Sequence, residues 1–313
     1  MHPSYSIIFF TTASGAGYGA LFWLGLLIAA GMLPHAPAFA IVSIALALGL
    51  VSAGLLASVA HLGRPERAIR AFSQWRSSWL SREAVAATAT YIPALGFLAI
   101  WAIAGAPIAT ARAFGLLSAL MACGTVACTA MIYASLAPVR QWHNGFTLPN
   151  YLLLSLYSGA VVLAAVSAFW RAAMLPAFLA LAAGAMALAI KILYWRYIDT
   201  EQRVLTPADA TGLGRFGRVR QLEPPHVEEN FLLREMGFQL ARKHASRLRR
   251  LAIVIGFLLP AVLQIVVLVA PVIVSVTAGT IAAILAVCGL IIERWLFFGE
   301  ATHTVTLYYG RTA

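Results

Sequence analysis

Eight apolar runs, each long enough to cross a lipid bilayer, constrain this chain more than any other feature. A helix needs about 20 predominantly apolar residues to span a hydrocarbon core of about 30 Å. Inside hydrocarbon the backbone must satisfy its own hydrogen bonds, so each run is predicted to be a helix. We expect an all-α, polytopic membrane protein that forms a single domain over residues 1–313. The predicted spans are 15–33, 37–62, 83–106, 112–136, 149–170, 174–198, 251–270 and 271–298.

The composition agrees with this fold and limits the metals that the chain could hold. The chain is 61% hydrophobic and 11% charged, whereas soluble domains carry about 25% charged residues. The cysteines are Cys123, Cys128 and Cys288, without CxxC spacing, so no iron–sulfur cluster or structural zinc is expected. Among the histidines, His61 and His303 come nearest to membrane depth, and no two are predicted to face each other across the bundle. We therefore expect neither metal nor haem in this chain.

Basic residues gather on one side of the predicted bundle. Nineteen of the 22 lysines and arginines lie near the termini or near the loops at 63–82, 137–148 and 199–250, which share one side. The positive-inside rule makes this side cytoplasmic, with both termini inside. The alternative is that these arginines bind a partner subunit and carry no information on topology. Nucleic-acid binding is not expected, because phospholipid head groups explain arginines that flank membrane spans.

The segment HLGRPERAIRAFSQWRSSWLSRE, at 61–83, concentrates polar residues between two apolar runs. It holds five arginines and two tryptophans, and Pro65 suits the first turn of a helix. Further residues recur at three- and four-residue steps, namely Ile69, Phe72, Arg76 and Trp79. Residues 63–82 are therefore predicted to form a short helix in the membrane interface, over the gap between the second and third spans.

His61 closes the second predicted span and Glu83 opens the third, so both are expected at one depth on the cytoplasmic side. A histidine exchanges protons near neutral pH, and a carboxylate beside it can take up or deliver a second proton. We predict that both are catalytic and serve a two-electron, two-proton quinone, with Arg64, Trp75 and Trp79 contributing to its binding. The alternative is structural: His61 satisfies a loop carbonyl, and Glu83 stabilises the positive end of the third helix.

A second candidate polar pocket lies near the end of the eighth span and comprises Glu293, Arg294, Trp295, Glu300 and His303. Adjacent residues of a helix point about 100° apart, so Glu293 and Arg294 need not pair with each other. Buried charges in membranes are often functional, although near helix ends they can reach the interface. Lys191 and Glu293 are the strongly ionisable residues at some depth. We interpret them as isolated from each other, and two isolated groups do not form a proton relay.

The longest loop, at 199–250, is predicted to dock a partner. Its second half, at 228–250, has the pattern of a helix. Leu232, Met236 and Leu240 follow at four-residue steps and make one apolar face. Such a face either lies on the membrane or receives a partner protein.

Five stretches give the chain a family resemblance that runs nearly from end to end. They are HPSYSIIFFTTASGAGYG at 2–19, the polar segment at 61–83, NGFTLPNYLL at 144–153, ENFLLREMGFQLARKHASRLR at 229–249 and ERWLFFGEATHTVTLYYG at 293–310. With them the chain resembles the membrane-anchor subunit of dimethyl sulfoxide reductase, the DmsC type. It departs from that pattern in a more irregular stretch at 212–225.

This resemblance implies a haem-free, eight-helix anchor that holds a molybdopterin catalytic subunit and an iron–sulfur subunit. Such an anchor passes electrons between a membrane quinone, ubiquinone or menaquinone, and the iron–sulfur partner. In the family, a histidine that ends the second helix and a glutamate that opens the third are tied to quinol binding, and these match His61 and Glu83. The same family includes the anchors of cytoplasm-facing, quinone-reducing sulfite dehydrogenases of the SoeABC type.

A secondary transporter is the alternative from a different functional class. Transporters tend to show internal repeats and helices that are broken near the midplane. The sequence shows neither feature beyond Pro260 in the seventh span.

Overall fold

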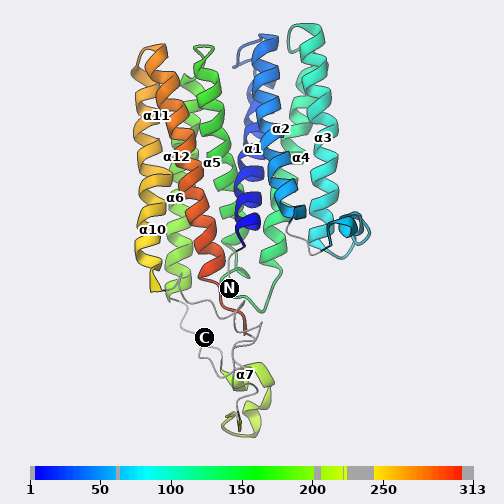
Figure 1. The fold of residues 1–313 in the computed structure, drawn as a ribbon, viewed down its shortest axis with the longest axis vertical. Coiled ribbons are helices and arrows are strands. Elements are labelled where there is room, and N and C mark those ends of the chain that lie inside the picture. Colours follow the sequence, from blue (N-terminus) through cyan, green and yellow to red (C-terminus); the bar gives the residue numbers. More distant parts are fainter. Residues whose placement is uncertain (1–3, 61–63, 201–205, 221, 224–242, 305–313) are drawn as a thin grey trace.

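The computed structural model describes residues 4–60, 64–200, 206–220, 222–223 and 243–304, and every element in these ranges is helical. Eight helices are long and apolar enough to cross a membrane, and they stand side by side in one bundle (Figure 1). They are α1 (Tyr5–Ala29), α2 (Pro37–Ala60), α3 (Trp79–Ala104), α4 (Ala109–Ala134), α5 (Thr147–Ala168), α6 (Met174–Thr200), the seventh span (Ala245–Val269) and α12 (Val272–Gly299). The predicted all-α fold with eight transmembrane helices is confirmed.

The first span begins well before the predicted residue 15, because α1 starts at Tyr5. Polar residues such as Thr12 and Ser14 make the sequence before residue 15 look unsuited to a membrane. Each of these two hydroxyls donates to the carbonyl four residues earlier in α1, at 2.9 and 2.6 Å respectively. Because the hydroxyls are satisfied within their own helix, the helix continues through them inside the bundle.

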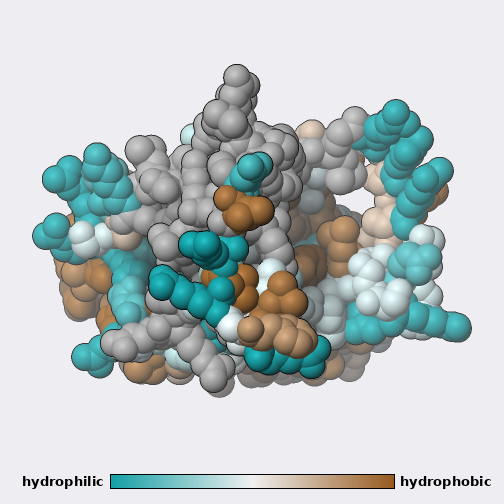
Figure 2. Space-filling model, turned by 90° about the horizontal axis from the view of Figure 1, so that it is seen from below, coloured by the Kyte–Doolittle hydropathy of each residue, from teal (hydrophilic) through white to brown (hydrophobic). Residues whose placement is uncertain are grey.

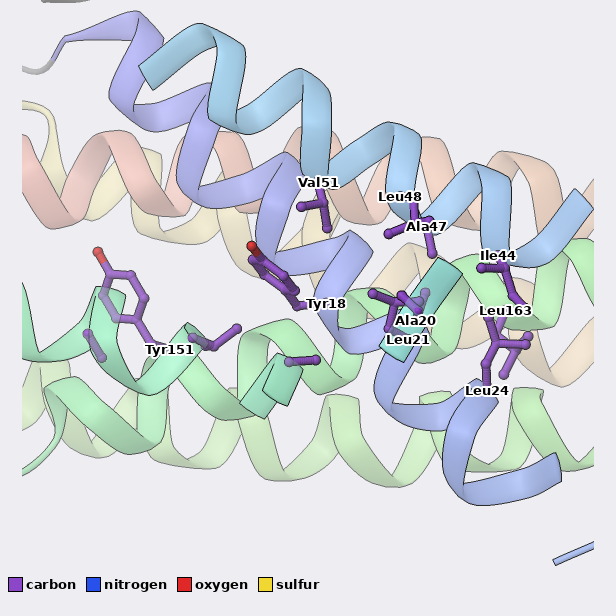
Figure 3. Packing of buried hydrophobic residues seen from close by; sticks show 14 of the residues in the cluster. Tyr18, Ala20, Leu21, Leu24, Ile44, Ala47, Leu48, Val51, Tyr151 and Leu163 are labelled. Carbon is purple, nitrogen blue, oxygen red and sulfur yellow. The ribbon is translucent and has the colours of Figure 1, made fainter. Parts of the chain in front are cut away.

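Helices α1 and α5 form the centre of the bundle. α1 packs against α2, α4, α5 and α12, and α5 also packs against α6 and α12. At the crossing of α1 and α5, a Cβ atom on Gly19 would lie 1.9 Å from the carbonyl oxygen of Ser155, and Gly159 faces Gly19. Small residues therefore set this close approach. Buried side chains fill the space around it, including Tyr18, Ala20, Leu21, Leu24, Ala47, Val51, Tyr151 and Leu163 (Figure 3).

The seventh span contains a π-helical segment. It runs without a break through α10 (Ala245–Ile253), the π-helix η3 (Val254–Leu258) and α11 (Leu259–Val269). Pro260 has no backbone N–H, so the carbonyl of Gly256 lacks the donor that a regular α-helix would give it. The hydroxyl of Tyr157, on α5, donates to this carbonyl at 2.6 Å. Gly256 also lies against Gly289 of α12, so the π segment contacts both neighbouring helices.

One end of the bundle carries both the beginning of α1 and the end of α12, and we refer to this end as the terminal face (Figure 1). Viewed from this end, hydrophilic side chains cover the flanks, with hydrophobic side chains among them (Figure 2). The 3₁₀-helix η1 (Pro65–Phe72) lies here, within the segment predicted to form an interfacial helix, and exposes Ile69 and Phe72. The short elements α7 (Pro207–Thr211) and η2 (Leu213–Phe216) belong to the loop at 199–250. The helix predicted at 228–250 falls outside the described residues as far as 242.

Candidate functional site

An apolar cavity of about 230 Å³ lies near the terminal face, between α1, α2, η1 and α3. Glu83 is the one ionisable side chain among its described lining residues, which are Phe10, Leu55, Ser58, Val59, Ala68, Ala71, Phe72, Leu80, Glu83, Ala84, Ala87 and Thr88. A dry apolar cavity of about 150 Å³ is large enough to bind benzene. This cavity therefore has room for a substituted ring that meets a single carboxylate.

Glu83 lies beyond the first turn of α3, because the helix begins at Trp79 and not at Glu83 as the sequence predicts. Only 6% of the residue is exposed, and its carboxylate accepts a hydrogen bond from the hydroxyl of Thr129 on α4. The effect of a helix dipole on a charge fades after the first turn. The geometry therefore does not favour the helix-end interpretation of Glu83.

The other predicted site residues do not line the apolar cavity where the structure describes them. Arg64 is exposed and Trp75 is 53% exposed, while Trp79 is partly buried at the start of α3. His61 lies outside the described residues, directly after Ala60 at the end of α2. The quinone roles of all four residues, like that of Glu83, stay predictions.

Arg82 ties the loop after η1 to the start of α3. Its Nε donates to the carbonyl of Trp75 at 3.0 Å, and its Nη2 donates to the carbonyl of Arg76 at 2.7 Å. Its guanidinium also lies 4.2 Å from the centre of the Trp79 ring. These contacts fix the polar segment beside Leu80, which lines the cavity.

Sequence reasoning missed most of the cavity wall. Phe10 was missed because the first span was predicted to begin after it, and Leu55 and Ala87 look like ordinary apolar residues of a span. The available signal was periodicity: Leu80, Glu83, Ala84 and Ala87 recur at steps of three and four on α3. That spacing places the four residues on one face of the helix.

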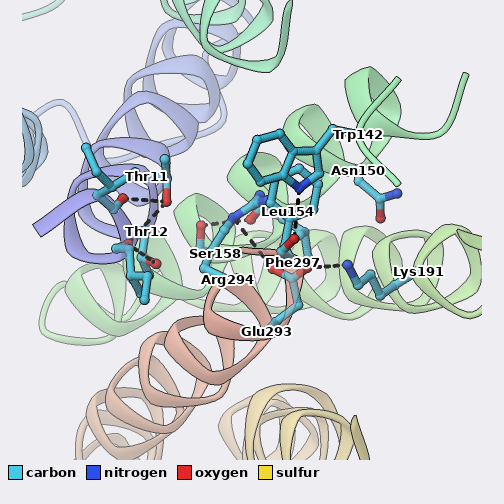
Figure 4. Close-up of polar contacts among 12 residues, drawn as sticks. Thr11, Thr12, Trp142, Asn150, Leu154, Ser158, Lys191, Glu293, Arg294 and Phe297 are labelled. Atoms are coloured by element: carbon cyan, nitrogen blue, oxygen red, sulfur yellow. Dashed lines mark hydrogen bonds and ion pairs between the residues drawn. The ribbon is translucent and has the colours of Figure 1, made fainter. Parts of the chain in front are cut away.

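The second predicted pocket contains a buried ionic cluster that joins α6 to α12. Lys191 forms an ion pair with Glu293, and Arg294 Nε lies 3.5 Å from the other oxygen of Glu293. All three side chains are buried, and the two cations approach Glu293 from different sides (Figure 4). The interpretation of Lys191 and Glu293 as isolated residues is therefore wrong. Arg294, which the charge pattern of the sequence groups with the basic residues outside the membrane, lies inside the bundle.

A second ionic group connects the seventh span to α6 and to the end of α12. Arg249 donates to Asp199 through two nitrogens, at 2.6 and 3.0 Å, and to Glu300 at 2.8 Å. Burial raises the pKa of the Glu300 carboxyl, and the Arg249 guanidinium opposes this rise. Among the described residues, no group of three or more His, Cys, Asp or Glu side chains is arranged to hold a metal ion. The expectation of a chain without haem or metal stays a prediction.

Comparison with known proteins identifies the family. A family model of the DMSO reductase anchor subunit (DmsC) matches residues 1–300. The chain belongs to the DmsC family. A sulfite dehydrogenase subunit from Allochromatium vinosum is 34% identical to this DmsC-family chain over 331 residues, which cover all of both chains. The anaerobic dimethyl sulfoxide reductase chain YnfH of Escherichia coli is 34% identical over 120 residues, covering 37% of this chain and 41% of YnfH.

The family and the eight spans together show a multi-pass membrane protein that is the anchor subunit of an oxidoreductase complex. This assignment replaces the transporter alternative.

Proposed function

We propose that this DmsC-family subunit binds a membrane quinone beside Glu83 and passes electrons between the quinone and an iron–sulfur partner subunit. The observation that carries the proposal is a single buried carboxylate in the wall of an apolar cavity. A quinone ring is largely apolar, whereas its two oxygens gain or lose protons as electrons move. An apolar cavity with one proton-exchanging group meets both requirements.

The redox step needs two groups that accept or donate protons, because a quinone and its quinol differ by two protons as well as two electrons. Oxidation of one quinol, ubiquinol or menaquinol, releases two electrons to the iron–sulfur partner and two protons to the protein. We assign one proton to Glu83 and the other to His61, which follows α2 directly in the chain. Reduction of a quinone reverses both transfers.

The proposed complex is of the sulfite dehydrogenase or dimethyl sulfoxide reductase type, with a molybdopterin catalytic subunit beyond the iron–sulfur subunit. The relative that aligns along its whole length carries the first of these names. The iron–sulfur partner is proposed to dock on the terminal face, through the segments at 63–82 and 199–250, because its cluster must come close to the cavity. We propose that this face is cytoplasmic, in the inner membrane of a bacterium, and the basic residues of these segments support this orientation.

Two adjacent residues of α3 provide a matched test of the quinone cavity. Ala84 lines the cavity, whereas Val85 is 38% exposed and does not line it. Ala84→Phe should therefore fill the cavity, while Val85→Phe adds the same ring to the outer surface of the bundle. We expect Ala84→Phe to abolish binding of a fluorescent quinone analogue to the purified complex, together with quinone-linked turnover.

Val85→Phe should keep both activities, and turnover with an artificial dye that bypasses the quinone should survive in both variants. Undiminished binding of the analogue to Ala84→Phe would show that the quinone binds elsewhere. Purification from the native membrane should also bring the iron–sulfur and molybdopterin subunits with the chain. Isolation of a lone chain would contradict the proposed partners.

A further inference from the structure

A second cavity, lined by polar groups, lies inside the bundle between α1, α4, α5 and α12. Its volume is about 20 Å³, and about 10–15 Å³ is enough to hold a water molecule. Hydroxyl groups and one guanidinium line it, among them those of Ser14, Tyr18, Thr129, Tyr151, Ser158 and Arg294. The cavity therefore has both the size and the chemistry to be hydrated.

Three groups that line this cavity point to a bound water. The hydroxyls of Tyr18 and Tyr151 and Nη1 of Arg294 are buried, and none has a hydrogen-bond partner within the described part of the chain. A buried polar group without a partner is costly. A water molecule in this cavity would meet the two to four polar partners that buried waters need.

The polar cavity reaches Glu83 through one residue. Thr129 lines the polar cavity, and its hydroxyl donates to the Glu83 carboxylate. Glu83 itself lines the apolar cavity on its other side. Within the polar cavity, the Arg294 guanidinium lies 3.8 Å from the centre of the Tyr151 ring. Glu83 therefore separates a site for an apolar ring from a polar interior.

On its other side the polar cavity meets the ionic cluster. Arg294 lines the cavity and lies beside Glu293, which is paired with Lys191. The Lys191 ammonium lies 5.2 Å from the centre of the Trp195 ring, and the Arg249 guanidinium lies 5.4 Å from the centre of the same ring.

Arg249 then holds Glu300 and Asp199, and the Asp199 side chain is 56% exposed. Charged groups thus follow one another from the polar cavity to the terminal face.

A purely structural role does not account well for this arrangement. A buried ion pair is weak evidence for stability, because desolvation offsets much of the attraction. Ionisable residues inside a membrane are by default functional candidates. An ion pair that only joined α6 to α12 would need Lys191 and Glu293 alone. Arg294 adds a second buried cation, which faces the polar cavity.

We propose that protons exchanged with the quinone travel between Glu83 and the terminal face through Thr129, the hydrated polar cavity and the cluster of Arg294, Glu293 and Lys191. This inference rests on the proposed quinone site. In quinol oxidation, Glu83 takes a proton from a quinol oxygen as the electrons leave for the iron–sulfur partner. It passes the proton through the Thr129 hydroxyl to water in the polar cavity.

The pair of Glu293 and Lys191 receives the proton from that water. A second water carries it from Lys191 to Glu300, whose Oε2 is buried and has no hydrogen-bond partner within the described residues, and Asp199 releases it to solvent. Quinone reduction runs the same path in reverse.

Phenylalanine variants of three tyrosines test the route. Tyr151→Phe and Tyr18→Phe each remove a hydroxyl that lines the polar cavity and has no partner within the described chain, so folding should be preserved. Tyr157→Phe is the matched control, because its hydroxyl bonds to Gly256 and does not line the cavity. We expect Tyr151→Phe to slow quinone-linked turnover by roughly tenfold, the scale of one lost hydrogen bond on the path, and Tyr18→Phe to act alike.

Both cavity variants should also show a larger solvent isotope effect in D₂O. Binding of the quinone analogue and turnover with the artificial dye should be unchanged in both. Tyr157→Phe should lower thermal stability while quinone-linked turnover and its isotope effect stay normal.

Lys191→Met interrupts the route between the polar cavity and Glu300, and Lys243→Met removes an exposed lysine as its control. Azide or formate, small weak acids that carry protons, should restore part of the turnover lost in Lys191→Met, which would not follow from a structural defect. Normal turnover and isotope effects in Tyr151→Phe, Tyr18→Phe and Lys191→Met, with intact analogue binding, would overturn the route and leave the quinone site standing. Failure of the unmodified complex to bind the analogue would overturn the quinone site itself.

Discussion

Replacement of Glu83 by glutamine should separate a proton-transfer role from a structural one. Glu83 is buried in α3, accepts a hydrogen bond from Thr129 and lines the apolar cavity. Glutamine has nearly the same shape and keeps an oxygen that can accept the bond from Thr129. It cannot take up and release a proton during turnover. The substitution therefore preserves the packing and removes the chemistry.

The two effects should differ clearly in size. Exchange of a charge-assisted hydrogen bond for a neutral one changes the free energy of unfolding by about 1 kcal/mol, and the lower cost of burying a neutral amide offsets part of this loss. Loss of a general acid–base group slows a reaction by roughly 10²–10⁴-fold. A hundredfold loss corresponds to about 2.7 kcal/mol in the activation barrier. The kinetic effect of Glu83→Gln should thus exceed its effect on stability.

Both quantities should be measured on the same preparation of the complex. Quinone-linked and dye-linked turnover report the kinetics, and thermal unfolding reports the stability. Glu66→Gln is the matched control, because Glu66 lies in η1 near the same cavity and is exposed. Normal quinone-linked turnover in Glu83→Gln would refute the proton role, and equal losses of quinone-linked and dye-linked turnover would indicate a structural defect instead.

His61→Ala should abolish quinone-linked turnover while the complex assembles and dye-linked turnover persists; untouched quinone turnover would make His61 structural. Gly19→Ala should overpack the crossing of α1 and α5, because the added Cβ would lie 1.9 Å from a backbone carbonyl of α5. We expect the free energy of unfolding to fall by about 1–3 kcal/mol, which lowers the melting temperature of the complex. Gly49→Ala, where nothing lies within 4 Å of the added atom, should not lower it, and equal melting temperatures would contradict the close crossing. Crosslinks to the iron–sulfur subunit should form from the terminal face, and crosslinks near Arg112 or Arg171 would place the partner on the wrong side. Turnover in reconstituted vesicles with a potential-sensitive dye should generate no membrane potential, because protons and electrons use the same face; an uncoupler-sensitive potential would reveal a path across the bilayer.

The spans were predictable because a membrane imposes length and apolarity on each helix separately. The ends of the spans were harder to predict, because they depend on contacts within the bundle. The start of α1 depends on hydroxyls such as those of Thr12 and Ser14, which are satisfied within the helix. The sequence predicts the start of α3 one turn too late, because residues 79–82 have a composition typical of the membrane interface and not of a span.

The ionic cluster shows which part of the candidate site the sequence could not supply. Lys191 and Glu293 lie at similar distances from the ends of α6 and α12 that meet the terminal face. Their common depth could have been read from the chain. Their pairing could not, because it depends on how α6 and α12 are rotated about their own axes. That rotation is set by packing against α5 and α11, and no local pattern records it.

The π segment of the seventh span fixes the rotational phase between its two halves. A π turn holds an additional residue compared with an α turn, so the residues before it are rotated by about 100° from their positions in an unbroken α-helix. The half before the segment carries Arg249, which holds Asp199 and Glu300 at the terminal face. A chain shortened by one residue within Val254–Leu258 would remain apolar and long enough to cross a bilayer, yet it would turn Arg249 away from both carboxylates. The number of residues in this span is therefore fixed by the rotation that its two halves need relative to each other. That condition is stricter than the one set by the thickness of the membrane.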